Sequence, residues 1–182
     1  MKNFKLVLII VAVIATVALM CVFMVQGAQN GAINREEQIE TAKSDIKVQE
    51  KRRADLIPNL VDCVKQYDKH EYNTLKDVIA SRGTNTDASV NEVKTMINAV
   101  AEQYPQLQAN TNYKQLMNEL SVTENLIAEY RSNFNKQVKE YNRYIRKFPT
   151  RFFLSMTGYE KIEYEYLNYD VSSDAPTNLF GD

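Results

Sequence analysis

The sequence predicts an all-α protein, in which an N-terminal transmembrane helix precedes an elongated antiparallel helical bundle with long helices. Three observations carry this prediction: one long apolar run at the N-terminus, apolar residues at helical spacing through most of the remainder, and few turn-forming residues. The 182 residues include only 5 glycines and 4 prolines, and no glycine lies between residues 84 and 157. A turn-rich β fold is therefore disfavoured, and the length suits one domain plus an anchor.

The first element is the apolar run at residues 4–26, and residues 1–27 are assigned as a transmembrane anchor. Between residues 6 and 25 the only polar side chain is Thr16. About 20 apolar residues in a helix span about 30 Å of hydrocarbon. A secretory signal peptide is the rival interpretation, but its apolar core is usually shorter, about 7–15 residues. We therefore expect an uncleaved anchor that contacts the lipid bilayer through residues 4–26.

The orientation of this anchor rests on few charges. Lys2 and Lys5 precede the apolar run, and only Arg35 and Lys43 follow it before residue 45. Because cytoplasmic flanks carry the excess of lysine and arginine, this distribution favours a cytoplasmic N-terminus with the bulk domain outside the cytoplasm.

The bundle is predicted over residues 28–168. Gly27 and the Asn30-Gly31 pair suggest a hinge after the anchor. Apolar residues then keep one helical phase from Ile33 to about Arg82, across Pro58. We therefore expect one long helix that is kinked at the proline.

Two further long elements follow a loop after Gly83. The spacing of Ser89 and Glu92 matches a capping box, which predicts that the second helix begins near Ser89. Pro105 ends or kinks it. The third helix runs from about residue 110 to Phe148. Helices this long share an apolar stripe only by packing lengthwise, which predicts the antiparallel bundle.

The C-terminal part is predicted to contain one more short helix. It follows Pro149 and closes the bundle, and Gly158 suits the position just after its end. Residues 159–167 alternate enough to be extended, and residues 169–182 read as a disordered tail.

Polar residues share the apolar stripes of the long helices. The third helix carries Glu124, Arg131, Asn135 and Asn142 among apolar positions, and the first carries Arg53 and Glu71 in the same way. Buried charges need partners, so these side chains predict a buried polar network that fixes helix register. Two alternatives stay open: the stripe faces a shallow, wet groove, or it forms a ligand or catalytic site. The candidate network consists of Arg53, Glu71, Glu124, Arg131, Asn135 and Asn142.

The pairing within this network is limited by helix geometry. Arg53 and Glu71 lie about five turns apart on one straight helix, some 27 Å, so they cannot pair directly. The pairs Arg53–Glu124 and Arg131–Glu71 cannot both hold in straight helices. Of the two, Arg131–Glu71 is the expected pair, and Glu71→Ala is expected to destabilise the protein far more than Glu36→Ala.

Signals for catalysis, metal or cofactor binding are weak, and no such residues are predicted. His70-Glu71 begins like the zinc motif HExxH, but the chain contains only 1 histidine. Cys63 lies seven residues from His70 without an activating context. The formal net charge of −1 argues against nucleic-acid binding.

Two sequence blocks, "KRRADLIPNLVDCVKQYDKHE" and "AEQYPQLQANTNYKQLMNELSVTENLIAEYRSNFNKQVKEYNRYIRKFP", resemble the bacterial LemA family over roughly residues 28–168. The resemblance implies a membrane-anchored helical bundle without an established enzymatic activity, and it implies no catalytic residue or cofactor. We therefore expect a non-enzymatic interaction or scaffold protein of the bacterial inner membrane, with an unknown envelope protein as partner. The alternative is an envelope sensory or small-ligand-binding module that uses the polar stripe. A membrane-associated enzyme is a weaker third hypothesis.

Overall fold

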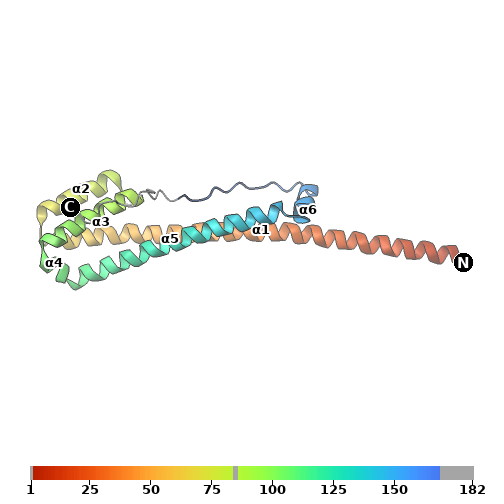
Figure 1. Ribbon diagram of the computed structural model, residues 1–182, viewed down its shortest axis with the longest axis horizontal. Coiled ribbons are helices and arrows are strands. Elements are labelled where there is room, and N and C mark those ends of the chain that lie inside the picture. Colours follow the sequence, from red (N-terminus) through yellow and green to blue (C-terminus); the bar gives the residue numbers. More distant parts are fainter. Residues whose placement is uncertain (1, 84–85, 169–182) are drawn as a thin grey trace, which may run out of the picture. The chain divides into compact units, whose positions relative to one another are not determined.

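The computed structural model describes residues 2–83 and 86–168, so the predicted tail at 169–182 lies outside the described residues. The described residues form helices and connections, with no strand among them, which confirms the all-α class. The helices, labelled in Figure 1, are α1 (Lys2–Val64), α2 (Lys69–Arg82), α3 (Asp87–Gln103), α4 (Pro105–Ala109), α5 (Thr111–Arg146) and α6 (Thr150–Met156).

The chain divides into two compact units. Unit 1 combines residues up to Glu36 with those from Phe134 onward, and unit 2 comprises Glu37–Asn133. The two longest helices, α1 and α5, contribute to both units. By contrast, α2, α3 and α4 belong to unit 2, and α6 belongs to unit 1.

Unit 2 is built around an apolar core that α1, α2, α3 and α5 share. Residues at helical spacing on α1 are fully buried, and Leu75 on α2, Val93 on α3 and Leu120 on α5 meet them. Burying a side chain of this size contributes roughly 1.5–3 kcal/mol. The core therefore holds the helices that carry the candidate polar residues.

The predicted single helix from Ile33 to Arg82 is wrong at both ends. The helix begins with the apolar run and ends at Val64, whose carbonyl accepts the N–H groups of Tyr67 and Asp68 at 2.9 and 3.0 Å. Asp68 then caps α2. Pro58 does lie inside α1, as expected. The apolar phase continues across the turn because both helices face the same core.

The start of α3 also differs from the prediction. Thr86, and not Ser89, is the N-cap, and its side chain accepts the N–H of Ser89 at 3.2 Å. Ser89 is buried within the first turn of the helix, while Glu92 pairs with Arg82 of α2. A threonine and a serine three residues apart offer two possible caps, and the helix begins at the earlier one.

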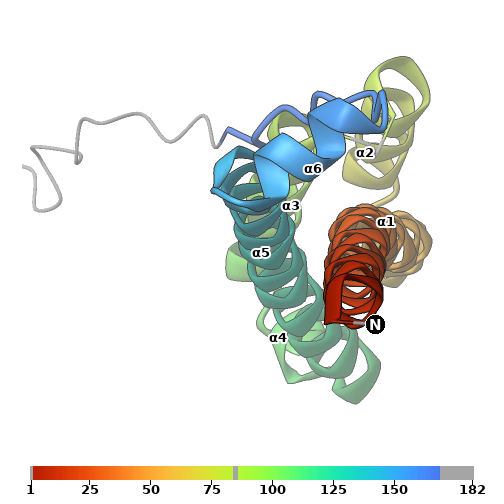
Figure 2. The ribbon, with the colours of Figure 1, turned by 90° about the vertical axis from the view of Figure 1, so that its right-hand side faces the viewer.

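Unit 1 places the C-terminal turns of α5 and the short α6 beside α1, as the end-on view shows (Figure 2). Buried residues here include Ala28 and Ala32 on α1, Val138 and Tyr141 on α5, and Leu154 on α6. The small alanines on α1 leave room for large side chains from α5.

The predicted hinge at Gly27 and Gly31 is wrong, because α1 is helical through both. Gly31 instead permits close packing: a Cβ atom there would overlap the hydroxyl of Tyr144 on α5. The lack of a side chain is used for contact, not for flexibility.

The N-terminal part of α1 at residues 4–24 is apolar and exposed along its whole length, and it is called the bare segment below. Residues 4–24 are all exposed, and the segment is long and apolar enough to cross a membrane. Its one polar side chain, Thr16, donates to the carbonyl oxygen of Ala12 at 2.9 Å, so it is satisfied within the helix. These features are those of a lipid-facing helix.

The short C-terminal helix agrees with its prediction. α6 begins directly after Pro149, and Gly158 follows its end with φ 67°. Residues 159–168 form no regular secondary structure and run as an extended segment (Figure 1).

Candidate functional site

Arg53 is the most deeply buried charged residue that the described part of the chain contains. It lies one turn before Ile57 on the core-facing side of α1, and only 1% of its surface is exposed. Its Nη1 lies 2.7 Å from Asp87 Oδ1 and 3.4 Å from Glu124 Oε1. One guanidinium of α1 is therefore held by carboxylates from α3 and α5.

Asp87 links this arginine to a second one. Its Oδ2 accepts from Nη1 of Arg131 on α5 at 2.6 Å, and Arg131 Nη2 also reaches Glu50 on α1 at 3.0 Å. Along the chain of contacts, charges alternate in sign from Glu124 to Glu50. Charge-assisted hydrogen bonds of this kind are stronger than neutral ones, so they fasten α1, α3 and α5 in one register.

The ion pairs shift the protonation of their members. The hydrogen bond from Arg131, reinforced by Arg53, holds the pKa of the Asp87 carboxyl below its usual value. The same contact with Asp87 raises the pKa of Arg131. Asp87 therefore stays ionised at neutral pH, which keeps both arginines paired.

Part of the Arg53 guanidinium has no hydrogen-bond partner among the described residues. Its Nε and Nη2 are buried without one, and so is Oε1 of Gln49, one turn earlier on α1. Two donors and one acceptor thus lie on one face of the same helix, inside the unit. Buried polar atoms are seldom left unpaired in native proteins, so these three atoms keep unused hydrogen-bonding capacity.

The structure brings together three of the six predicted network residues. Arg53, Glu124 and Arg131 belong to one cluster, which Asp87 and Glu50 complete. The cluster extends from the interior of unit 2 to its surface, because Arg53 is buried while Glu124 and Arg131 are half-buried. Asp87 was not predicted as part of the cluster. Acidic residues are common at the start of a helix because they interact favourably with its dipole, so an aspartate there does not by itself indicate an ion pair.

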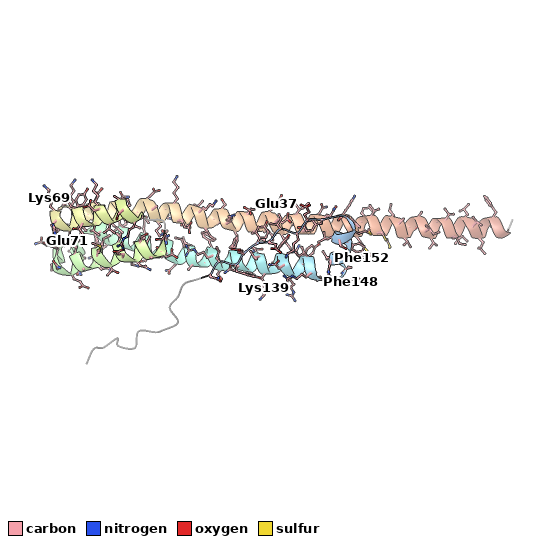
Figure 3. The ribbon with its side chains drawn as sticks, turned by 90° about the horizontal axis from the view of Figure 1, so that it is seen from above. Glu37, Lys69, Glu71, Lys139, Phe148 and Phe152 are labelled. Atoms are coloured by element: carbon pink, nitrogen blue, oxygen red, sulfur yellow. The ribbon has the colours of Figure 1, made fainter. Side chains whose placement is uncertain are left out.

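The predicted Arg131–Glu71 pair is wrong, because Arg131 binds Asp87 and Glu50. Glu71 lies in the first turn of α2, close to Lys69, the first residue of that helix (Figure 3). Its backbone N–H donates to the capping carboxylate of Asp68 at 3.0 Å. That hydrogen bond lowers the pKa of Asp68.

Asn135 and Asn142 belong to unit 1, whereas the arginine cluster belongs to unit 2. The Asn135 amide exchanges two hydrogen bonds of 2.8 Å with the backbone of Leu167. It therefore holds the extended C-terminal segment against α5. Both asparagines are half-buried, and the fully buried positions are their neighbours Phe134 and Tyr141.

A second polar cluster in unit 1 was not predicted. Glu36 on α1 accepts hydrogen bonds from the hydroxyls of Tyr159 and Tyr141, the latter at 3.3 Å. The two hydroxyls lie 2.9 Å apart, and Tyr141 also accepts the N–H of Ile162 at 3.1 Å. Burial, followed by the contact with Glu36, raises the pKa of Tyr159. The abundance of tyrosines near the C-terminus was the available signal.

Other reactive side chains are dispersed. Within residues 2–83 and 86–168, no three histidine, cysteine or acidic side chains gather in a way that could hold a metal ion. Burial raises the pKa of the Cys63 thiol, which makes it a poor nucleophile. His70 is exposed at the start of α2.

Comparison with known proteins gives matches over different parts of the chain. Protein LemA of Metamycoplasma hominis is 28% identical over 140 residues, covering 70% of this chain and 64% of that protein. Magnetosome protein MamQ of Magnetospirillum gryphiswaldense is 38% identical over 66 residues, covering 36% of this chain and 24% of MamQ. Magnetosome protein MamQ 2 of Paramagnetospirillum magneticum matches to the same extent. The chain thus spans about a quarter of the MamQ proteins and under two thirds of the LemA protein.

A family model extends the match through most of the helical part. The model described as the LemA family matches residues 42–178, which is more than half of the chain. The matched range contains Arg53, Asp87 and Arg131, the centre of the ion-pair cluster. The sequence resemblance is confirmed, and the chain belongs to the LemA family.

Proposed function

We propose that this chain is a membrane-anchored, non-enzymatic interaction or scaffold protein of the bacterial cell envelope. The observation that carries the proposal is the continuity of α1. A bare apolar segment at residues 4–24 and the core residues Ile57, Leu60 and Val64 belong to one helix. Such a helix suits a protein that presents a folded domain from a bilayer.

The ion-pair cluster supports a structural role for the polar residues. A general acid or base works best with a pKa near the operating pH. Asp87 has its pKa lowered by two arginines, and its oxygens are already engaged by them. These groups stabilise the helices, which leaves the outer surfaces of the bundle for partners.

The proposed partner is another envelope protein, and proximity labelling from the full chain in its native host tests this. We expect a reproducible set of envelope proteins that is absent when the labelling enzyme is fused to the apolar segment alone. Identical labelled sets for the two fusions would reject a specific interaction role for the bundle.

The proposed orientation places the bulk domain outside the cytoplasm. Its test uses Asp182→Cys in a chain that also carries Cys21→Ala and Cys63→Ala, so that only one thiol is present. An impermeant thiol reagent should label this variant in intact spheroplasts. Labelling only after lysis would place the domain in the cytoplasm.

A second candidate function is the binding of a small ligand, and the unpaired polar atoms of Arg53 and Gln49 favour it. Two donors beside one acceptor suit a small molecule that carries an anionic or carbonyl oxygen and a donor. A thermal-shift screen of such molecules on the full chain would test it, because a ligand that binds the native state raises the melting temperature. The ligand should stabilise the wild type but not Gln49→Leu, and no stabilisation by any of them would reject this function.

A further inference from the structure

The turn between α5 and α6 exposes apolar and basic side chains together. Phe148, Phe152 and Met156 are 83%, 57% and 61% exposed. The interface turn, defined here as residues 146–156, also exposes three cations and contains no acidic residue. These cations are Arg146, Lys147 and Arg151. Figure 3 shows Phe148 and Phe152 next to each other at this end of unit 1.

The helix α6 has two distinct faces. Thr150 and Leu154, one turn apart, are buried against unit 1. Phe152 and Met156, also one turn apart, point to the other side and are exposed. The exposed apolar groups of α6 are thus directed outward by the packing of its opposite face. The Phe152 ring makes an edge-to-face contact with its chain neighbour Phe153, with 5.6 Å between the ring centroids, and it stays 57% exposed.

The interface turn lies level with the end of the apolar segment of α1. The hydroxyl of Tyr144 donates to the carbonyl oxygens of Gly27 and Ala28, at 3.3 and 3.4 Å. Since α5 runs antiparallel to α1 here and ends at Arg146, the interface turn that follows lies further toward the N-terminus of α1 than Gly27 and Ala28 do. In that direction, the next half-buried residue of α1 is Val25, which directly follows the exposed residues 4–24. Among residues 2–83 and 86–168, no segment lies beside α1 beyond α6 (Figure 1).

We propose that the interface turn is a second membrane contact, which binds the surface of an anionic phospholipid bilayer. Phe148, Phe152 and Met156 enter the boundary between headgroups and acyl chains. Arg146, Lys147 and Arg151 bind headgroup phosphates. The inference rests on the proposed function in one respect, because α1 must cross the same bilayer.

The chemistry of the turn matches that surface. Aromatic side chains concentrate where headgroups meet acyl chains, and cations beside them are attracted to anionic lipids. The anchor also keeps the turn at the bilayer, so a contact that is weak by itself has a high effective concentration. The contact would hold unit 1 against the membrane surface.

A second copy of the chain is a poorer occupant for this surface. A symmetric two-copy contact brings the same patch of each copy together. It would place Arg146, Lys147 and Arg151 of one copy against the same cations of the other, without an acidic residue in the turn to offset them. Anionic headgroups supply the missing negative charge.

Tryptophan substitution tests the inference cleanly, because the natural chain contains 0 tryptophans. The full chain would be reconstituted into vesicles of phosphatidylglycerol and phosphatidylcholine as Phe148→Trp, Ile14→Trp or Tyr166→Trp. Ile14 lies within the apolar segment. Tyr166 is an exposed residue of unit 1 beside Leu167. Leu167 is hydrogen-bonded to Asn135, which lies about 17 Å before the end of α5 at Arg146. Quenching by lipids brominated near the headgroup or near the chain end reports the depth.

We expect strong shallow quenching for Phe148→Trp, deep quenching for Ile14→Trp and little of either for Tyr166→Trp. Replacing the three cations of the turn by glutamine, or the anionic lipid by phosphatidylcholine alone, should reduce the shallow quenching at least twofold. Unchanged quenching in both cases would overturn the assigned role of the cations and the anionic headgroups.

Two other results would overturn the contact, and they separate it from the anchor. If Ile14→Trp is quenched while Phe148→Trp behaves like Tyr166→Trp, the contact is rejected and the anchor stands. If Ile14→Trp escapes quenching as well, both are rejected. Fluorescence of Phe148→Trp that is unquenched and varies with the protein-to-lipid ratio would assign the surface to a second copy.

Discussion

Arg53 on α1 and Asp87 at the start of α3 are 34 residues apart in the chain, yet their side chains meet at 2.7 Å. The Arg53 side chain is buried, whereas half of the Asp87 side chain is exposed. The contact therefore lets a carboxylate at the surface neutralise a charge in the interior. Because Asp87 also binds Arg131, a single carboxylate holds three helices together.

Asp87→Ala should destabilise unit 2 by about 2 kcal/mol, the usual scale for a lost hydrogen bond to a charged partner. Arg53 would keep only Glu124, at 3.4 Å. Denaturant unfolding of the full chain in detergent, followed by circular dichroism, measures the change. Asp77→Ala is the matched control, since Asp77 is an exposed aspartate on α2. Equal losses in the two variants would show that the cluster contributes no specific stability.

The same carboxylate predicts a loss of stability in acid. The folded state lowers the pKa of Asp87, so the unfolded state binds its proton first as the pH falls. The contribution is complete above the unfolded pKa of about 4 and is lost as the pH falls through the lower folded value. The wild type should therefore melt higher than Asp87→Asn at pH 6, and the difference should shrink below about pH 4. A constant difference from pH 6 to pH 2.5 would contradict the assignment.

The fold class and most helices could be predicted because they depend on local patterns. Apolar spacing and scarce glycine defined the long helices, and Gly158 marked the end of α6. The division between α1 and α2 was missed because the apolar phase continues through it. A local signal was present: Asp68 and Glu71 have the spacing of a helix start, with Asp68 as the cap.

The candidate site was predictable only in part, for geometric reasons. Arg53 and Glu124 could be chosen because a charge on an apolar stripe needs a partner. Asp87 could not, since its approach to Arg53 depends on how α3 packs after a loop. On α5 the stripe was traced one residue late, through Asn135 and Asn142. The buried positions are Phe134 and Tyr141, whereas Val138 and Ile145 of the same stripe are buried as expected. The miss arises because three-residue and four-residue steps were taken in the wrong order between these positions.

Glu36 and Glu71 provide a test in which the structure reverses the expectation from sequence. Glu36 accepts hydrogen bonds from Tyr141 and Tyr159, whereas the contact of Glu71 with Asp68 is made by its backbone. Glu36→Ala should therefore cost about 2 kcal/mol, because it removes the carboxylate that accepts from both hydroxyls and leaves at least one of them without an acceptor. Glu71→Ala should cost under about 1 kcal/mol, since it removes only a favourable charge from the first turn of α2.

Melting temperatures of the two alanine variants, measured on the full chain in detergent, give the comparison directly. Glu36→Gln is a useful third variant, because its amide oxygen still accepts a hydrogen bond and should restore part of the loss. A larger loss for Glu71→Ala than for Glu36→Ala would support the order expected from sequence and contradict the contacts of unit 1.

Gly31 and Gly27, one turn apart on α1, should respond oppositely to alanine. A Cβ atom on Gly31 would overlap the hydroxyl of Tyr144, while a Cβ atom on Gly27 meets nothing within 4 Å. Tyr144 also stacks under the Arg35 guanidinium, 3.9 Å from the ring centre, so its ring has limited freedom to move. Gly31→Ala should destabilise unit 1 by about 1–3 kcal/mol, the usual cost of overpacking.

Gly27→Ala should instead stabilise by about 0.5–1 kcal/mol, because alanine is the better helix former at an open position. Thermal unfolding of both variants in detergent, followed by tyrosine absorbance, measures the pair. The added Cβ would overlap the Cζ atom of Tyr144 as well as its hydroxyl. Adding Tyr144→Leu to Gly31→Ala removes both atoms and should recover much of the loss. If Gly31→Ala were as stable as Gly27→Ala, the close approach of α5 to α1 would be wrong, and the placement of the interface turn near the end of the apolar segment would lose its geometric basis.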